Sequence, residues 1–340
     1  MRTRRLGTHG PVVSEVGLGC MSMSGAYGPS DDEESLATID AALAGGITLL
    51  DTGDFYGMGD NELLVGRALR RHDRDGVVLS VKFGALRGPD GRFAGYDTRP
   101  RAAWNFLAYS LRRLGTDHLD VYRPARVDPA VPIEETVGAV GEMIEAGYVR
   151  HVGLSEVGVD TLRRACAVRP ICDLQIEYSL LSRGIETAIL PTCRELGVAV
   201  TAYGVLSRGL LSGHWQPDRL AAGDGRRRFP RFAPGHIEAN LALVEALRRV
   251  ADARGASVAQ VATAWVAAQG EDVVPLVGAR RREQLAESIG ALELSLGATD
   301  LAAIEEAVPA GAAAGTRYGE QQMGELDSER PAESPNRPGS

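Results

Sequence analysis

The stretch VRHVGLSEVGVDTLRRACAVRPICDLQI, residues 149–176, contains a short apolar run, a longer helical run and a second short apolar run. We predict a strand at 149–154, a helix at 159–168 and a strand at 171–176. Two strands joined through a helix pair in parallel, because the helix carries the chain back to the starting edge of the sheet. This stretch therefore predicts one unit of an α/β fold with a parallel sheet.

The same alternation extends in both directions along the chain. Strands are predicted at 16–20, 47–51, 77–82, 119–122, 149–154, 171–176, 198–203 and 273–277. Helices are predicted at 32–43, 61–70, 101–114, 133–146, 159–168, 186–196, 238–254 and 257–268. Eight such units in 340 residues favour a closed (β/α)8 TIM barrel over an open doubly wound sheet.

The two ends of the chain depart from this alternation. Arg4 to Gly7 and the turn at His9 to Pro11 predict an N-terminal β-hairpin that closes the barrel bottom. Helices at 281–289 and 299–307 are expected to pack outside the barrel. The segment after Gly311 reads as a loop, followed by a disordered tail from about Leu326. We expect one domain over residues 1–325 and a flexible tail over 326–340.

Composition excludes several classes of function. The net charge of −8 makes nucleic acid an unlikely partner, because an acidic surface repels phosphates. The four cysteines have no zinc-ligand spacing to each other or to a histidine, so no metal site is expected. No apolar run is long enough to cross a membrane, and the basic N-terminus has no signal-peptide core. We expect a cytoplasmic protein, of open oligomeric state, with a solvated basic loop at 226–231.

Polar residues follow several predicted strands on the face where TIM barrels bind their substrates. These residues are Asp51, Tyr56, Lys82, Gln175 and Tyr203. Each alone has an ordinary role, as a helix cap, a packed ring or a solvated cation. Together they predict an acid–base set, in which Asp51 holds Lys82 and the ammonium lowers the pKa of Tyr56 from about 10 toward working pH. Tyr56 would then donate a proton to a carbonyl oxygen.

Several motifs resemble those of the aldo-keto reductase superfamily. They are residues 49–57 (LLDTGDFYG), Lys82 after a strand, 153–156 (GLSE), 175–178 (QIEY), 204–211 (GVLSRGLL) and 275–280 (PLVGAR) with Gln284 and Ser288. Order and spacing match from about Arg4 to Val308. The sequences of these motifs are most similar to those of the bacterial branch with aryl-aldehyde, aryl-alcohol and pyridoxal reductase members.

The resemblance implies an NADPH-dependent enzyme that reduces an aldehyde or ketone, a small-molecule carbonyl substrate, by hydride transfer. It implies catalytic roles for Asp51, Tyr56 and Lys82. Cofactor contacts are implied for Gly19, Cys20, Met21, Asp51, Ser155, Glu156, Gln175, Tyr203, Gly204, Leu206, Arg208, Gly209, Leu210, Val277, Gly278, Ala279, Arg280, Gln284 and Ser288. Arg280 and Gln284 match the contacts of the adenosine 2′-phosphate, which favours NADPH over NADH.

Three positions depart from the family pattern. Glu156 and Ser288 each stand where the family has Asn. Ala125 stands at the position of the fourth catalytic residue, a histidine. Tyr27, Tyr56 and Ala125 are expected to line the substrate pocket.

Because alanine replaces the histidine, the sequence does not identify the second hydrogen-bond donor to the carbonyl oxygen of the substrate. Arg123 or Arg126 could replace it, although strand alternation argues against both doing so. A substrate with its own polar anchor should then be preferred over simple aldehydes. Two other functions stay open: reduction of a conjugated double bond, and an NADP(H)-binding protein without catalysis that serves a partner.

Overall fold

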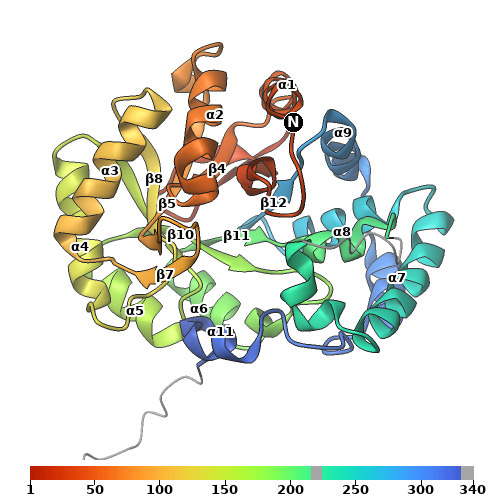
Figure 1. The fold of residues 1–340 in the computed structure, drawn as a ribbon. Helices are drawn as coiled ribbons and strands as arrows, with labels where there is room; N and C mark the ends of the chain where they lie inside the picture. The colour runs from red at the N-terminus through yellow and green to blue at the C-terminus, as the bar shows by residue number, and fades with distance from the viewer. Residues whose placement is uncertain (216–223, 331–340) are drawn as a thin grey trace, which may run out of the picture.

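The computed structural model describes residues 1–215 and 224–330, and its centre is a closed barrel of eight parallel strands (Figure 1). The strands are β3 (Gly17–Gly19), β4 (Leu49–Gly53), β5 (Val78–Phe83), β8 (Leu119–Pro124), β9 (Val149–Ser155), β10 (Ile171–Glu177), β11 (Ala199–Tyr203) and β12 (Val273–Gly278). They neighbour one another in chain order, and β12 pairs with β3 to close the ring. The predicted (β/α)8 barrel is confirmed.

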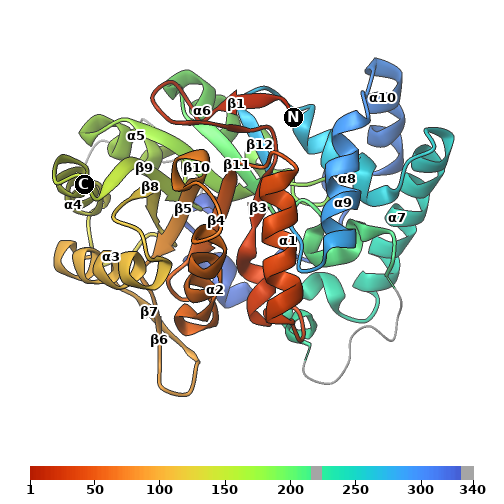
Figure 2. The ribbon, with the colours of Figure 1, turned by 90° about the horizontal axis from the view of Figure 1, so that it is seen from above.

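Helices surround the barrel (Figures 1 and 2). They are α1 (Asp32–Ala44), α2 (Asp60–Leu69), α3 (Pro100–Leu114), α4 (Ile133–Glu145), α5 (Val159–Val168), α6 (Ile189–Leu196), α7 (His236–Ala253), α8 (Val258–Ala267), α9 (Arg282–Gly290) and α10 (Ala298–Ala307). In α3, Ala103, Leu107 and Leu114 are buried at helical spacing. Pro100 suits the first turn of α3, and Gly115 ends it in a left-handed conformation.

The N-terminal hairpin closes the barrel bottom, as predicted. Strands β1 (Thr3–Arg5) and β2 (Val12–Ser14) pair antiparallel. Leu6 packs into an inner cluster with Leu49, Val121 and Val274, which come from three different barrel strands. Gly7 has φ +62°, and a Cβ there would lie 2.5 Å from two carbonyl oxygens, so the close approach requires glycine.

A second hairpin, which the sequence analysis did not predict, follows β5. It consists of β6 (Ala85–Arg87) and β7 (Phe93–Tyr96) and projects away from the barrel on the side of the strands' carboxyl ends (Figure 2). The guanidinium of Arg87 lies over the Phe55 ring at 5.9 Å. The hairpin is thus attached to the loop that carries Tyr56.

The expected tail from Leu326 was wrong for the residues that the structure describes. After α11 (Glu320–Glu325), Leu326 is buried and Asp327–Glu329 form a short 3-10 helix. The Asp327 carboxylate accepts a hydrogen bond of 2.8 Å from the Gly158 backbone amide. The order comes from this partner on the barrel and not from local composition. Residues 331–340 lie outside the described part of the chain.

No helix among the described residues is sufficiently long and apolar to span a membrane.

Candidate active site

A buried ion pair between Asp51 and Lys82 lies where β4 and β5 reach the barrel mouth. The Lys82 ammonium donates to Asp51 Oδ2. Asp51 Oδ1 accepts from Ser80 Oγ at 2.9 Å and from Gln175 Nε2 at 2.8 Å. Burial lowers the pKa of Lys82, and the Asp51 charge opposes that shift. The structure therefore contains the predicted Asp51–Lys82 pair, and Gln175 is bound to it.

Tyr56 begins a short 3-10 helix, Tyr56–Gly59, which follows β4 after Asp54 and Phe55. Its ring is partly exposed, and Lys82 Nζ lies 5.1 Å from the ring centroid. The expectation that Lys82 lowers the pKa of the phenol was wrong: burial, followed by the Asp51 charge, raises it well above 10. Asp51 offsets the Lys82 charge. The phenol stays protonated at neutral pH, and this is the form that can donate a proton.

The two arginines proposed to replace histidine occupy different places. Arg123 is fully buried inside the barrel, where it donates to Asp173 at 2.9 Å and to Ser80 Oγ at 2.9 Å. Arg126 lies past the end of β8 and is partly exposed at the mouth. It donates to Ala125 O at 2.6 Å and, over 3.4 Å, to Ser155 Oγ. Only Arg126 is therefore placed to meet a ligand.

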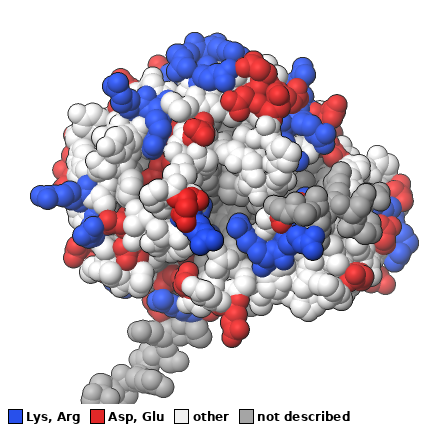
Figure 3. Space-filling view, viewed as in Figure 1, with Lys and Arg blue, Asp and Glu red and all other residues white. Residues whose placement is uncertain are grey.

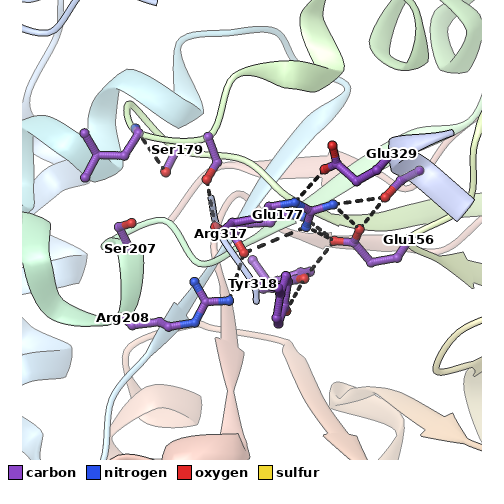
Figure 4. A network of polar contacts seen from close by, with 12 residues as sticks. Glu156, Glu177, Ser179, Ser207, Arg208, Arg317, Tyr318 and Glu329 are labelled. Carbon is purple, nitrogen blue, oxygen red and sulfur yellow. Dashed lines mark hydrogen bonds and ion pairs between the residues drawn. The ribbon is translucent and has the colours of Figure 1, made fainter. Parts of the chain in front are cut away.

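Glu156, which follows β9, is completely engaged by protein groups (Figure 4). Arg317 donates to both carboxylate oxygens at 2.8 and 2.6 Å. Tyr203 and Ser328 add hydroxyl donors at 2.7 and 2.6 Å, and the Glu177 amide donates at 3.0 Å. Burial alone would raise the pKa of Glu156, but the charge and hydrogen bonds of Arg317 lower it to about 2. The carboxylate that was expected beside a nicotinamide also holds the C-terminal segment on the barrel.

A second buried carboxylate, Glu177 at the end of β10, binds arginines from the segment after β11 (Figure 4). Arg208 donates to it at 3.1 Å and has φ +57°, within the short 3-10 helix Ser207–Ser212 that also holds Gly209 and Leu210. Arg231 donates to it at 3.3 Å and is buried. The solvated basic loop was therefore wrong for Arg231, which gains a buried counter-ion. Residues 216–223 of this loop lie outside the described part.

The segments expected to bind the cofactor meet where β12 and β3 pair. Gly278 faces Gly19 in register, with Val277 and Ala279 beside it and Cys20 and Met21 after Gly19. Arg280 donates to the backbone oxygens of Tyr27 and Gly28 at 3.2 and 3.1 Å. A cavity of about 190 Å³ lies between Arg280 and Arg281 and residues 29–34, which include the first turn of α1. Gln284 accepts from the Arg280 amide at 3.2 Å, and Ser288 is buried in α9.

Two further residues were expected in the substrate pocket. Ala125 is buried, and its amide donates to the Phe83 carbonyl at 2.8 Å. Tyr27 lies in the loop after β3, and burial raises its pKa to about 12, opposed by the Arg208 charge. Leu206 and Gly204 are partly exposed at the end of β11. This face of the molecule is hollowed near its centre, and Lys and Arg side chains gather along the hollow (Figure 3).

The model of the aldo/keto reductase family matches residues 15–309. The chain belongs to the aldo-keto reductase family. It is 42% identical over 317 residues to the probable aldo-keto reductase 1 of Glycine max, covering 92% of this chain and 91% of that protein.

Solved structures of the family share the fold. The glycerol dehydrogenase of Gluconobacter oxydans has a TM-score of 0.82 and 28% identity, and 99% of each chain is covered. An aldo-keto reductase of Bacillus halodurans, in its holo form, has a TM-score of 0.76 and 28% identity, covering 92% of this chain and 97% of that one. This aldo-keto reductase is thus an oxidoreductase that uses a nicotinamide cofactor to reduce carbonyl compounds.

Residues at the mouth of this aldo-keto reductase escaped the sequence analysis. Tyr318 shares a hydrogen bond of 2.9 Å with the Tyr203 hydroxyl, and Arg317 binds Glu156. Tyr96 comes from the unpredicted hairpin, and the Arg126 charge acts against the rise that burial causes in its pKa. The pair Arg317-Tyr318 stands out in a stretch of Gly and Ala, and this was the available signal.

Proposed function

We propose that the protein reduces an aldehyde or ketone with NADPH, and that Tyr56 donates the proton to the carbonyl oxygen. The observation that carries this proposal is the partly exposed phenol of Tyr56 beside the buried Asp51–Lys82 pair. A phenol whose pKa is raised holds its proton until a stronger base, the developing alkoxide, forms next to it.

The residues near β12 fit a dinucleotide. Ser22 Oγ is buried and has no hydrogen-bond partner among the described residues. A Cβ on Gly278 would come no closer than 4.0 Å to another group, that same Ser22 Oγ, so the backbone there borders open space. The cavity beside Arg280 and Arg281 suits an anionic group, because its carboxylates are engaged elsewhere: Glu34 binds Arg282 at 2.9 Å and Asp31 caps α1.

We assign the cofactor contacts as the resemblance implies. Arg280 and Gln284 would hold the 2′-phosphate, Ser155 and Gln175 the carboxamide, and Tyr203 the nicotinamide ring. NADPH, when bound, supplies the hydride that adds to the carbonyl carbon.

The chain supplies orientation and the proton. Ser80 and Gln175 fix Asp51, and Asp51 fixes Lys82 beneath the Tyr56 ring. The phenol O–H is thereby held in one place, and its proton passes to the oxygen as that oxygen gains negative charge. Such general acid catalysis contributes about 10²–10⁴ in rate.

Replacement of Tyr56 by Phe tests the proposal. We expect kcat for aldehyde reduction, followed by NADPH absorbance, to fall by about 10²–10⁴. NADPH binding, followed by fluorescence, should stay near the wild-type value, because the phenol is not among the assigned cofactor contacts. Tyr109→Phe is the matched control, since Tyr109 lies on α3 and is 56% exposed. Near-normal turnover of Tyr56→Phe would place the proton donor elsewhere.

A further inference from the structure

Arg126 differs from the other enclosed arginines at the barrel mouth, because it has no counter-ion. Arg123 is paired with Asp173 at 2.9 Å, Arg208 with Glu177 at 3.1 Å and Arg317 with Glu156 at 2.6 Å. Within the described ranges 1–215 and 224–330, no carboxylate oxygen lies within 4.0 Å of the Arg126 guanidinium. A cation in so enclosed a place is costly unless an anion meets it.

Three carboxylates at the mouth, Asp51, Glu156 and Glu177, are already engaged. Asp51 is held by Lys82, Ser80 and Gln175. The oxygens of Glu156 accept from Arg317, Tyr203, Ser328 and a backbone amide. Those of Glu177 accept from Arg208, Arg231 and Ser182. No described carboxylate therefore contacts Arg126 directly, and the Glu156 charge that acts on it is already paired with Arg317.

The guanidinium of Arg126 also has hydrogen-bonding capacity to spare. Its one short bond goes to Ala125 O, at 2.6 Å. The bonds to Ser155 Oγ and the Tyr318 hydroxyl are both 3.4 Å long. A guanidinium carries five N–H donors in a planar fork that matches a carboxylate. Since the side chain is partly exposed, a ligand at the mouth can reach these donors.

Arg126 and Tyr56 are both partly exposed, and the Arg126 charge acts on the Tyr56 phenol. The pKa of Tyr56 is raised by burial and by Asp51, and the Arg126 charge opposes that rise. Ser155, which Arg126 contacts, is also an assigned cofactor contact. An anionic group at Arg126 would thus lie near both the proton donor and the hydride donor.

We propose that Arg126 binds a carboxylate of the substrate and that the preferred substrates are oxo acids, in which a carboxylate lies next to the carbonyl carbon. The inference rests on the proposed function, because Tyr56 must protonate the carbonyl oxygen. In the reaction the carbonyl carbon accepts a hydride from NADPH, its oxygen accepts a proton, and a hydroxy acid and NADP⁺ form. Arg126 is then a specificity-determining residue that replaces the donor lost at Ala125.

Phenylglyoxylate and its methyl ester form the matched pair that tests this, because they share ring and carbonyl and differ in charge. We expect wild-type kcat/KM to be about ten- to a hundredfold higher for the acid, the range for a charge-assisted bond. In Arg126→Met, kcat/KM should be about equal for acid and ester, and Arg126→Lys should keep part of the preference for the acid. Arg163→Met, on the exposed side of α5, should keep all of it.

A second measurement does not depend on turnover. Calorimetric titration of benzoate into the protein with NADP⁺ should show binding that Arg126→Met weakens at least tenfold, while benzamide binds neither protein. If Arg126→Met does not fold, Arg126→Lys is used for both measurements, with an expected partial loss.

The outcomes separate the two proposals. Equal kcat/KM for acid and ester, or benzoate binding unchanged in the Arg126 variants, would overturn the role of Arg126 and leave Tyr56 as proton donor. Turnover that survives Tyr56→Phe would overturn the proposed function, and the benzoate titration would still decide whether Arg126 binds a carboxylate.

Discussion

Replacement of Arg317 by Met should destabilise the protein through a residue 161 positions earlier in the chain, Glu156. The Arg317 side chain is 8% exposed and that of Glu156 is 0% exposed. Methionine keeps much of the volume and removes the charge, the two hydrogen bonds to Glu156 and those to Glu329 and Ser328. Glu156 would then be a buried carboxylate with only hydroxyl and amide donors.

The expected loss is about 3–5 kcal/mol, the usual cost of removing one partner of a buried ion pair. The fall in the pKa of Glu156 from 4.5 to about 2, to which Arg317 is the largest favourable contributor, corresponds to a free energy of the same order, about 3 kcal/mol at about 1.36 kcal/mol per unit. An unfolding entropy of about 2.1 cal/mol/K per residue over 340 residues converts a loss of about 3–5 kcal/mol into a fall in Tm of about 4–7 °C.

The pH dependence has a defined sign. The folded pKa of Glu156 lies below its unfolded value, so its contribution is complete above about pH 4.5 and is lost as pH falls toward about 2. Thermal unfolding by circular dichroism, at neutral pH and in steps down through this window, measures both effects. In Glu156→Gln, Tm should depend less on pH in this window than it does in the wild type.

Arg163→Met is the matched control for the Arg317 variant. Arg163 also binds a glutamate through two hydrogen bonds, but it and Glu195 are 43% and 59% exposed. Its loss should not shift Tm measurably. If Arg317→Met and Arg163→Met unfold at the same temperature, Arg317 does not hold Glu156 as argued.

Two further predictions concern the cofactor and the neighbouring loop. Arg280→Ala should weaken NADPH binding about ten- to a hundredfold and leave NADH binding nearly unchanged, and equal weakening of both in fluorescence titrations would refute the phosphate contact. Burial, with the Glu62 charge, raises the pKa of Asp54 from 3.8 to about 7, so wild-type stability falls as pH rises through that interval. Asp54→Asn should therefore raise Tm at about pH 8 and leave it unchanged at about pH 4, and the same gain at both would contradict the buried-carboxyl argument.

The barrel and the Asp51–Lys82 pair followed from the sequence because both depend on local patterns. Apolar runs alternate with helices, and residues at the carboxyl ends of parallel strands must meet. The role of Arg317 did not follow, because it depends on Glu156, and no local pattern joins the two.

Strand alternation argued that Arg123 and Arg126 would not both take the place of the histidine, and the structure agrees. Arg123 is buried against Asp173, whereas Arg126, past the end of β8 at Pro124, is partly exposed at the mouth. The pKa of Tyr56 was missed for another reason. Proximity of an ammonium was visible in the sequence, whereas burial of the phenol and the neutralising effect of Asp51 are properties of the folded site.

The pairing of β12 with β3, which closes the barrel, also has a consequence for folding during synthesis of the chain. Arg4 donates to the carbonyls of Ala267 and Gly270, and β3 obtains one of its two neighbours only when β12 arrives. The N-terminal hairpin leaves the ribosome first and is among the last segments to find its partners, which is the arrangement that slows folding. A nascent chain that ends before Val273 presents β3 and β11 as open edges. Unpaired edges of this kind can pair with other chains, so aggregation of the nascent chain is favoured until β12 is added.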